Sequence, residues 1–298
     1  MAGRLCDALA QIYTPEPWRV ARSLAVLSRL ADRPEDAKRY QHLADFSGPA
    51  DILRWRAQVL LESVTDSWDE WESARAAEVL LDAVTQLFRL VPMSEEKEYA
   101  RQAYALACRA KRGKLQLDAL HAESQIDFES NDLDASAEHA EAALRIARAL
   151  PDMKGQAEAL LTIGATASRK AETLGAAAAV TDFEQAETTL DSAARAFRKL
   201  GERVSEAHTR KALGYAHYWH FIRFGGWHTP SAQLELEECQ MQFEAALEIL
   251  RGLQEENALT ANEVAAIVEL LVYFGQINAA GGHWETASEQ YSDAVGLP

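Results

Sequence analysis

The residue types best suited to chemistry gather in one segment rich in histidine and aromatic side chains, residues 215–228. Its His217 and His220 lie three positions apart, which places both on one face of a helix, and His228 follows shortly after. Imidazole groups serve as acid–base catalysts and as metal ligands. A metal site needs a third firm ligand that the sequence does not identify, so we expect satisfied or exposed histidines, with no metal and no cofactor.

Motifs for nucleophilic or phosphate chemistry are not convincing. Cys6, Cys108 and Cys239 are far apart and lack CxxC spacing, which disfavours a disulfide framework or a structural zinc site. The two glutamates before Cys239 would raise its thiol pKa rather than activate it. The sequence contains no glycine loop of Walker or Rossmann type. We therefore expect a protein that is not an enzyme, with a helical-repeat enzyme using His217, His220 and His228 as the minority alternative.

Composition favours an all-α protein, and the net charge argues against some classes of binding partner. The 298 residues are 48% hydrophobic, and only 8 Pro and 15 Gly interrupt them. The net charge of −16 makes the chain a poor general binder of polyanions, because phosphate affinity depends on Lys and Arg. We therefore expect no nucleic acid and no membrane among its partners. Since no apolar run suggests a signal peptide or a membrane span, we expect a cytoplasmic location.

Helix start and stop signals divide the chain into helices joined by short links, which force neighbouring helices to pack antiparallel. In the first part of the chain we expect a helix from Thr14-Pro15, one over residues 52–64, one from Asp66 or Ser67 to near Val91, and one from Ser94 that Gly113 closes. Beyond Lys114 we expect helices at residues 114–130, 132–150, 153–175, 181–200, 203–224, 231–254, 257–280 and 283–296.

A pattern of small residues recurs about every fifty residues along these helices. Its copies are anchored on Ala143, Ala193, Ala245 and Ala294, at spacings of 50, 52 and 49 residues. The clearest copy runs Leu271-x-x-Phe274-Gly275, then Gly282-x-Trp284-x-x-Ala287-x-x-x-Tyr291-x-x-Ala294. A period of this kind predicts stacked helical hairpins, each too small to bury its own apolar face.

These spacings resemble the tetratricopeptide repeat family, in which small residues lie where the two helices of a hairpin touch. The resemblance covers about residues 114–298 and implies a right-handed α-solenoid of antiparallel helical hairpins. Residues 1–113 are then divergent repeats or a helical cap. The family's repeat is about 34 residues, so units near 50 need longer helices or insertions, which we place at residues 174–180 and 224–231.

The resemblance also implies a concave, ligand-facing surface lined by the first helix of each hairpin. With Gly214 at the small-residue position, helix 203–224 projects aromatic and cationic side chains onto this surface, beside an arginine of the preceding repeat. Together with a loop tryptophan, the predicted partner-binding residues are Arg169, His208, Lys211, Tyr215, Tyr218, Trp219 and Trp227. The alternative is that the aromatic residues fill the seam between helices, and that Trp227 staples the hairpin.

The leading functional hypothesis is a non-catalytic scaffold or sensor that binds a peptide or protein segment on this concave face. The alternative from another class is a regulatory domain that senses a small molecule in an aromatic pocket near Trp219 and Trp227. The last repeat carries Trp284 and Tyr291 with no polar capping helix after it. We therefore expect this end to dock on a second copy or a partner, or the chain to be part of a longer protein.

Overall fold

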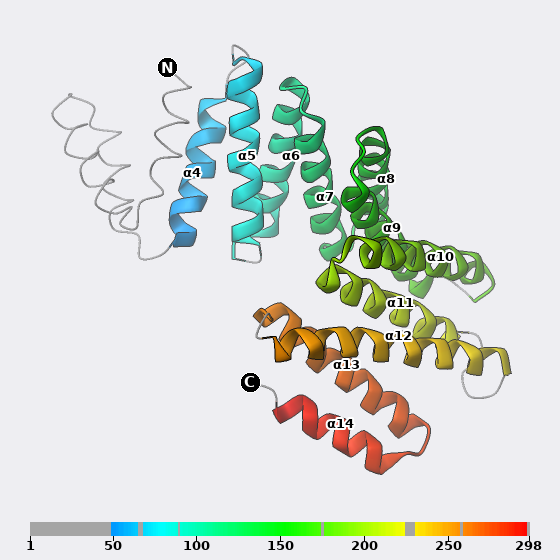
Figure 1. The fold of residues 1–298 in the computed structure, drawn as a ribbon. Helices are drawn as coiled ribbons and strands as arrows, with labels where there is room; N and C mark the ends of the chain where they lie inside the picture. Colours follow the sequence, from blue (N-terminus) through cyan, green and yellow to red (C-terminus); the bar gives the residue numbers. More distant parts are fainter. Residues whose placement is uncertain are drawn as a thin grey trace. The chain divides into compact units, whose positions relative to one another are not determined.

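The computed structural model describes residues 49–64, 68–88, 90–173, 176–223, 230–256 and 259–296, and every regular element within them is an α-helix (Figure 1). The helix predicted from Thr14-Pro15 lies outside these residues. Contacts divide the chain into two compact units, Met1–Asp132 and Leu133–Pro298. The predicted domain boundary at residue 113 came from the repeat register and stays a prediction.

The first unit contains four described helices with one shared core. They are α4 (Pro49–Ser63), α5 (Glu70–Leu87), α6 (Met93–Arg109) and α7 (Gly113–Glu129). Leu60, Leu80 and Leu106 are among the side chains completely buried between them. The start of α5 was predicted too early. Asp69 caps the helix by accepting a hydrogen bond from the backbone N–H of Glu72, whose own carboxylate accepts from the backbone N–H of Asp69.

The second unit contains seven described helices, and each of them packs against the next in chain order (Figure 1). They are α8 (Leu133–Ala149), α9 (Met153–Thr173), α10 (Ala176–Leu200), α11 (Arg203–Arg223), α12 (Pro230–Glu255), α13 (Ala261–Ala280) and α14 (Trp284–Gly296). The predicted all-α array of antiparallel helical hairpins is confirmed. The surplus over a short repeat is mainly helical, because α9 to α12 have 21, 25, 21 and 26 residues.

Three glycines set how closely the helices of each hairpin approach. A Cβ added to Gly164 would lie 2.6 Å from Leu190 Cγ, and one added to Gly275 would lie 2.5 Å from Tyr291 Cε1. A Cβ on Gly214 would collide with the ring of Phe243. Each glycine of the first helix therefore accepts a large side chain of the second, which is the contact that the repeat pattern predicts.

The third anchor of the repeat pattern was wrong by one residue. Ala246 is completely buried, as Ala193 is, whereas Ala245 is half-buried and lines a hollow. Ala246 also stands three residues after Phe243, the spacing that separates Leu190 from Ala193. Residue size alone does not choose between two adjacent alanines, so the register becomes clear only from the position of the large residue.

Four of the links between helices contain a residue with a positive φ angle. Lys111, Asn131, Gly201 and Gly282 have positive φ angles of 52°, 61°, 73° and 83°. A residue in this left-handed conformation ends a helix and turns the chain back. The segment Lys111-Arg112-Gly113 was predicted to close α6, and the helix ends directly before it, but Lys111 rather than Gly113 takes the left-handed conformation, and Gly113 is already the first residue of α7.

The N-terminus of α13 supports one stability prediction. The Thr260 hydroxyl accepts from the backbone N–H of Asn262, and the Glu263 carboxylate accepts from the backbone N–H of Thr260. Burial alone would raise the pKa of Glu263, but the Thr260 hydroxyl and backbone N–H outweigh it and hold this pKa below the ordinary value. We expect Thr260→Ala to lower the free energy of unfolding by about 1 kcal/mol at pH 7.

This loss should shrink in acid. A carboxylate with a lowered folded-state pKa stabilises the protein above its unfolded pKa, and that stability disappears as the pH falls through the folded pKa. Urea denaturation at pH 7 and near pH 3.5 measures both values, and Thr260→Ser keeps the hydroxyl as the control. An equal loss at both pH values would contradict the coupling to Glu263.

Among the described residues, α13 is also the one helix long and apolar enough to cross a membrane, with a mean hydropathy of 1.3 over its most apolar window. The expectation that no stretch approaches such a composition is thereby corrected. Leu270, Leu271 and Phe274 of this helix pack into the core of the second unit. A core helix meets the same criterion, so one such helix is weak evidence for a membrane span.

Candidate functional site

Helices α9 and α11 carry six of the seven predicted partner-binding residues, and we call the surface that α9, α11 and α13, the first helices of three consecutive hairpins, form the inner face. Arg169 comes from α9, and His208, Lys211, Tyr215, Tyr218 and Trp219 come from α11. The seventh, Trp227, lies outside the described residues, as does His228. The sequence reading omitted Tyr273 of α13, which contacts two of the predicted tyrosines.

The aromatic residues of α11 divide between core and surface. Tyr215 makes edge contacts with Phe243 and Tyr273 at ring-centroid distances of 5.3 and 4.7 Å, and burial raises the pKa of its hydroxyl. This residue fills the seam between helices. Tyr218 lies edge-on to Trp219 at 5.8 Å and to Tyr273 at 5.6 Å, and all three of these side chains are partly exposed.

The two residues of α11 that were predicted as cations each face a carboxylate of α13. Lys211 Nζ lies 2.6 Å from Glu269 Oε2, and His208 Nε2 lies 3.8 Å from Glu263 Oε1. Burial first, and then the nearby Lys211, lower the pKa of His208, so its ring is mainly neutral near pH 7. The exposed Arg169 lies close to Glu172 of its own helix. The inner face therefore offers aromatic surface with balanced charges.

The histidines of α11 meet carboxylates from both neighbouring helices. His217 Nδ1 lies 2.7 Å from Glu235 Oε2 on α12, and His220 Nδ1 lies 2.8 Å from Glu187 Oε1 on α10. The crossed pairs, His217 with Glu187 and His220 with Glu235, are each 3.4 Å apart. We call these four residues the His–Glu cluster.

Hydrogen bonding in the His–Glu cluster changes its protonation. Burial alone would lower the pKa of His220, but hydrogen bonds to Glu187 and Glu235 outweigh it and raise the value to about 9. Burial would likewise raise the pKa of Glu235, yet hydrogen bonds from His217 and His220 lower it to about 2. The expectation that these histidines have satisfied partners is confirmed for His217 and His220. The partner glutamates were missed, because they come from other helices.

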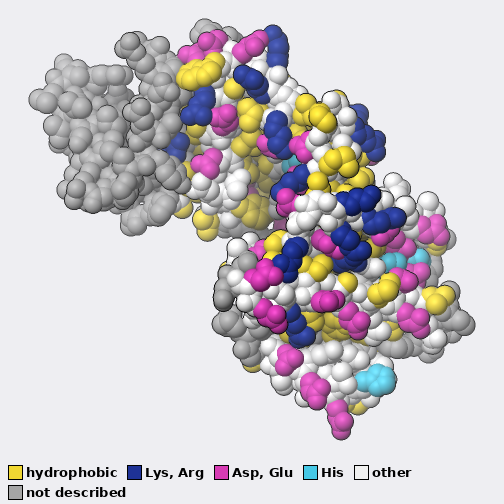
Figure 2. Space-filling view, viewed as in Figure 1, with side chains coloured by type: hydrophobic (Ala, Val, Ile, Leu, Met, Phe, Trp, Pro, Cys, Tyr) yellow, Lys and Arg dark blue, Asp and Glu magenta, His cyan; other side chains and the backbone are white. Residues whose placement is uncertain are grey.

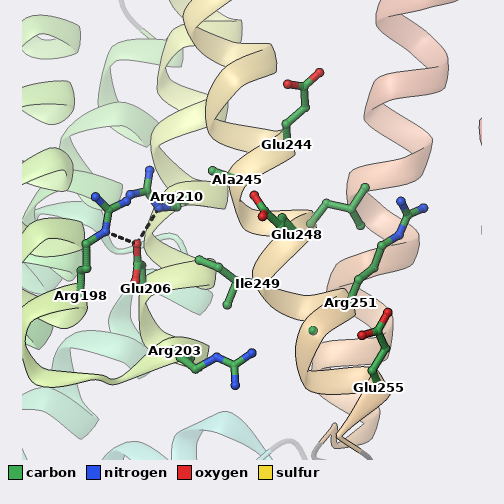
Figure 3. A pocket seen from close by; sticks show the side chains of 12 residues that line it. Arg198, Arg203, Glu206, Arg210, Glu244, Ala245, Glu248, Ile249, Arg251 and Glu255 are labelled. Carbon is green, nitrogen blue, oxygen red and sulfur yellow. Dashed lines mark hydrogen bonds and ion pairs between the residues drawn. The ribbon is translucent and has the colours of Figure 1, made fainter.

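A hollow of about 850 Å³ lies elsewhere, among α10, α11 and α12 (Figure 3). Its arginines face carboxylates: the Glu206 carboxylate accepts from Arg198 and Arg210, each at 2.9 Å, and Arg203 pairs with Glu256 at 2.7 Å. Figure 2 likewise shows Lys and Arg side chains lying next to Asp and Glu on the viewed face of the second unit. The sequence reading did not single out this hollow.

The predicted exposure at the last hairpin is observed. Trp284 and Val295 are 70% and 86% exposed, and they line a second hollow of about 580 Å³ with Tyr291. Docking of a second copy or a partner on this end stays a prediction.

The two described cysteines, Cys108 and Cys239, differ in burial. Cys108 is exposed, whereas burial raises the pKa of the Cys239 thiol well above its ordinary range. The neighbouring Glu237 and Glu238 are exposed on α12, so the predicted cause of the raised pKa was wrong although its direction was right.

Comparisons with known proteins bear on the fold. No protein-family model matches the chain, and the search of curated proteins returned no significant match. BtubC (BKLC) from P. vanneervenii matches with a TM-score of 0.57 and 16% identity, over 82% of this chain and 86% of that chain. The likeness shows the fold alone.

Two further matches are structures of IFIT1 monomeric mutants, both with a TM-score of 0.23. The one with m7Gppp-AAAA is 13% identical over 94% of this chain and 81% of that chain, and the one with Gppp-AAAA is 14% identical over 91% and 79%. Both of these structures hold a capped oligonucleotide, and the expectation of no nucleic acid partner is withdrawn. A net negative charge does not exclude a local basic site, and TM-scores this low carry no argument about what this chain binds.

Proposed function

We propose that this chain is a non-catalytic scaffold of tetratricopeptide-like repeats, whose inner face binds an uncharged, apolar peptide segment. One observation carries the proposal: Tyr218, Trp219 and Tyr273 form a continuous edge-to-face group that is partly exposed on the inner face. Tyrosine and tryptophan supply much of the energy at protein interfaces, because they bury large areas and lose little conformational freedom.

The charges beside this group indicate the chemistry of the segment. Lys211 and Glu269 satisfy each other across α11 and α13, and the neighbouring His208 faces Glu263. A strongly charged peptide would have to compete with the ion pair between Lys211 and Glu269, whereas an apolar one would not. The face also extends across three consecutive hairpins, which suits an elongated segment better than a compact metabolite.

Single truncations of Tyr218 and Trp219 test the proposal. Peptides are selected on the wild-type protein from a random display library, and their Kd values are then measured on each variant by fluorescence anisotropy. We expect Trp219→Ala and Tyr218→Ala to weaken binding at least tenfold, about 1.4 kcal/mol or more. The matched control is Trp71→Ala, which removes a tryptophan 48% exposed in the first unit.

Circular dichroism and thermal melting must first show that each variant is folded, because Trp219 also packs against Ala171 and Phe183. Unchanged Kd values in folded Trp219→Ala and Tyr218→Ala would contradict the proposal. Enrichment of mainly charged peptides, or of no peptide at all, would count against it equally.

A further inference from the structure

The His–Glu cluster gathers two ligand types from three helices at one point. Glu187 belongs to α10, His217 and His220 to α11, and Glu235 to α12. One carboxylate oxygen of each glutamate and the His217 ring nitrogen all lie within 4.8 Å of one another. His220 Nδ1 joins them at 2.8 Å from Glu187 and 3.4 Å from Glu235. Two nitrogen and two oxygen donors therefore converge on one small volume, and a metal ion bound there displaces to solvent the proton that His220 holds near pH 7.

The spacing of these atoms suits a small cation. Ligands placed about 2.0 to 2.2 Å from a tetrahedral zinc ion lie about 3.3 to 3.6 Å from one another. The two crossed contacts of the cluster are already 3.4 Å long, and the direct contacts of 2.7 and 2.8 Å need to open by less than about 1 Å. Side-chain movement alone supplies such a change.

The surroundings hold the donors in place. The ring of Phe183, which is completely buried, stacks on His220 with a centroid distance of 5.4 Å and an interplanar angle of 8°. The side chains of the cluster are between 12% and 24% exposed, so they are shielded but reachable from solvent. Ligands fixed by neighbouring contacts bind metal ions with little reorganisation.

We propose that the His–Glu cluster binds a divalent transition metal ion and thereby ties α10, α11 and α12 together. Imidazole with carboxylate favours Zn²⁺ and its first-row neighbours, whereas Ca²⁺ and Mg²⁺ prefer all-oxygen sites. Tyr218 and Trp219 lie between the two histidines in sequence. A bound ion therefore fixes the stretch of α11 that carries the aromatic group of the inner face.

Equilibrium dialysis of the full chain against Zn²⁺ tests the proposal. We expect one tightly bound ion per chain, removed by EDTA, and a higher melting temperature in its presence. A Co²⁺-loaded sample should show the visible d–d absorption of a tetrahedral site. His217→Gln, His220→Gln, Glu187→Gln and Glu235→Gln are each expected to weaken Zn²⁺ binding at least tenfold.

Two control variants separate this site from adventitious binding. His283→Gln removes an exposed histidine, and Glu237→Gln removes an exposed glutamate two residues from Glu235. Both are expected to bind Zn²⁺ as the wild type does. The glutamine replacements keep a polar side chain of similar size, and circular dichroism checks their folding.

Three results would overturn the proposal: a folded wild type without stoichiometric Zn²⁺ binding, equal binding by all four cluster variants, or loss of binding in a control. None of them bears on the peptide measurements, which are made in EDTA, so the two proposals fail separately.

Discussion

Gly214→Ala lowers the free energy of unfolding by about 1 to 3 kcal/mol, although alanine is the better helix former. The added methyl group collides with the ring of Phe243, which is completely buried and lies edge-on to Tyr215 and Phe274. Because these neighbours fill the space around the ring, it has no free volume to move into. The loss is measured by urea denaturation followed by tryptophan fluorescence.

A double-mutant cycle identifies the cause of that loss. Phe243→Leu alone should destabilise the protein, because it removes a buried ring from α12. If the collision is responsible, Gly214→Ala should cost much less in the Phe243→Leu background, giving a coupling energy of about 1 kcal/mol or more.

Gly252→Ala is the matched control for this cycle. It lies in the same hairpin, and its added Cβ would meet only the end of the long Arg203 side chain, at 3.0 Å, rather than a buried ring. We expect this substitution to leave the stability unchanged or raise it by up to about 1 kcal/mol, since Gly weakens a helix interior. If Gly214→Ala and Phe243→Leu have strictly additive effects on the free energy of unfolding, the collision between the added methyl group and the Phe243 ring is not the cause of the loss.

The second large effect is expected in the first unit, at Lys97. Its ammonium lies 2.5 Å from Oδ1 of Asp127, whose side chain is completely buried, and 3.9 Å from Oδ2 of Asp132. Lys97→Met keeps the aliphatic stem and removes the charge that faces these carboxylates. We expect a loss of about 1 to 2 kcal/mol in the free energy of unfolding, because a buried carboxylate loses a compensating cation, although the 45% exposure of the Lys97 side chain weakens the pair by solvent screening.

The ion pair between Lys97 and Asp127 should also make the stability of the wild type fall at alkaline pH. The hydrogen bond to Asp127 raises the pKa of Lys97, although burial opposes it. A lysine whose pKa is higher in the folded than in the unfolded protein stabilises the fold fully below its unfolded-state pKa. This stabilisation disappears as the pH rises through the folded-state pKa. The difference between wild type and Lys97→Met should therefore shrink above about pH 10.5.

Charge removal on both sides tests this explanation. Lys97→Met/Asp127→Asn should regain most of the lost stability, because no buried charge then lacks its counterion. Lys114→Met breaks an exposed pair with Asp118 and should change the stability little. If the double variant is no more stable than Lys97→Met, the loss has another origin.

Local signals were enough to predict most of the helices. The predicted limits of α9, α11 and α14 agree with the structure within two residues, because caps, links and apolar periodicity are properties of the nearby sequence. The repeat pattern also identified Gly164, Gly214 and Gly275, since only a residue without a side chain fits such close helix contacts. The start of α5 failed because three polar residues compete there to cap it.

Contacts between helices were largely beyond the sequence. Glu187 and Glu235 lie beside the histidines of α11 because of the axial offset between each long helix and its neighbour. That offset depends on the links and on the packing of large side chains, and neither is encoded by spacing within one helix. For the same reason the sequence placed Lys211 on the inner face without showing that Glu269 of α13 neutralises it.

The pairing of a glycine with a large side chain in each hairpin also constrains how such a sequence can evolve. From the present state, a larger residue at position 214 is tolerated only after Phe243 has become smaller, so one order of substitutions is open and the reverse order passes through an unstable intermediate. The pair at 164 with 190, whose leucine is likewise completely buried, imposes the same order. In lineages related to this chain, the residues of each pair should therefore change together, with the large partner shrinking first.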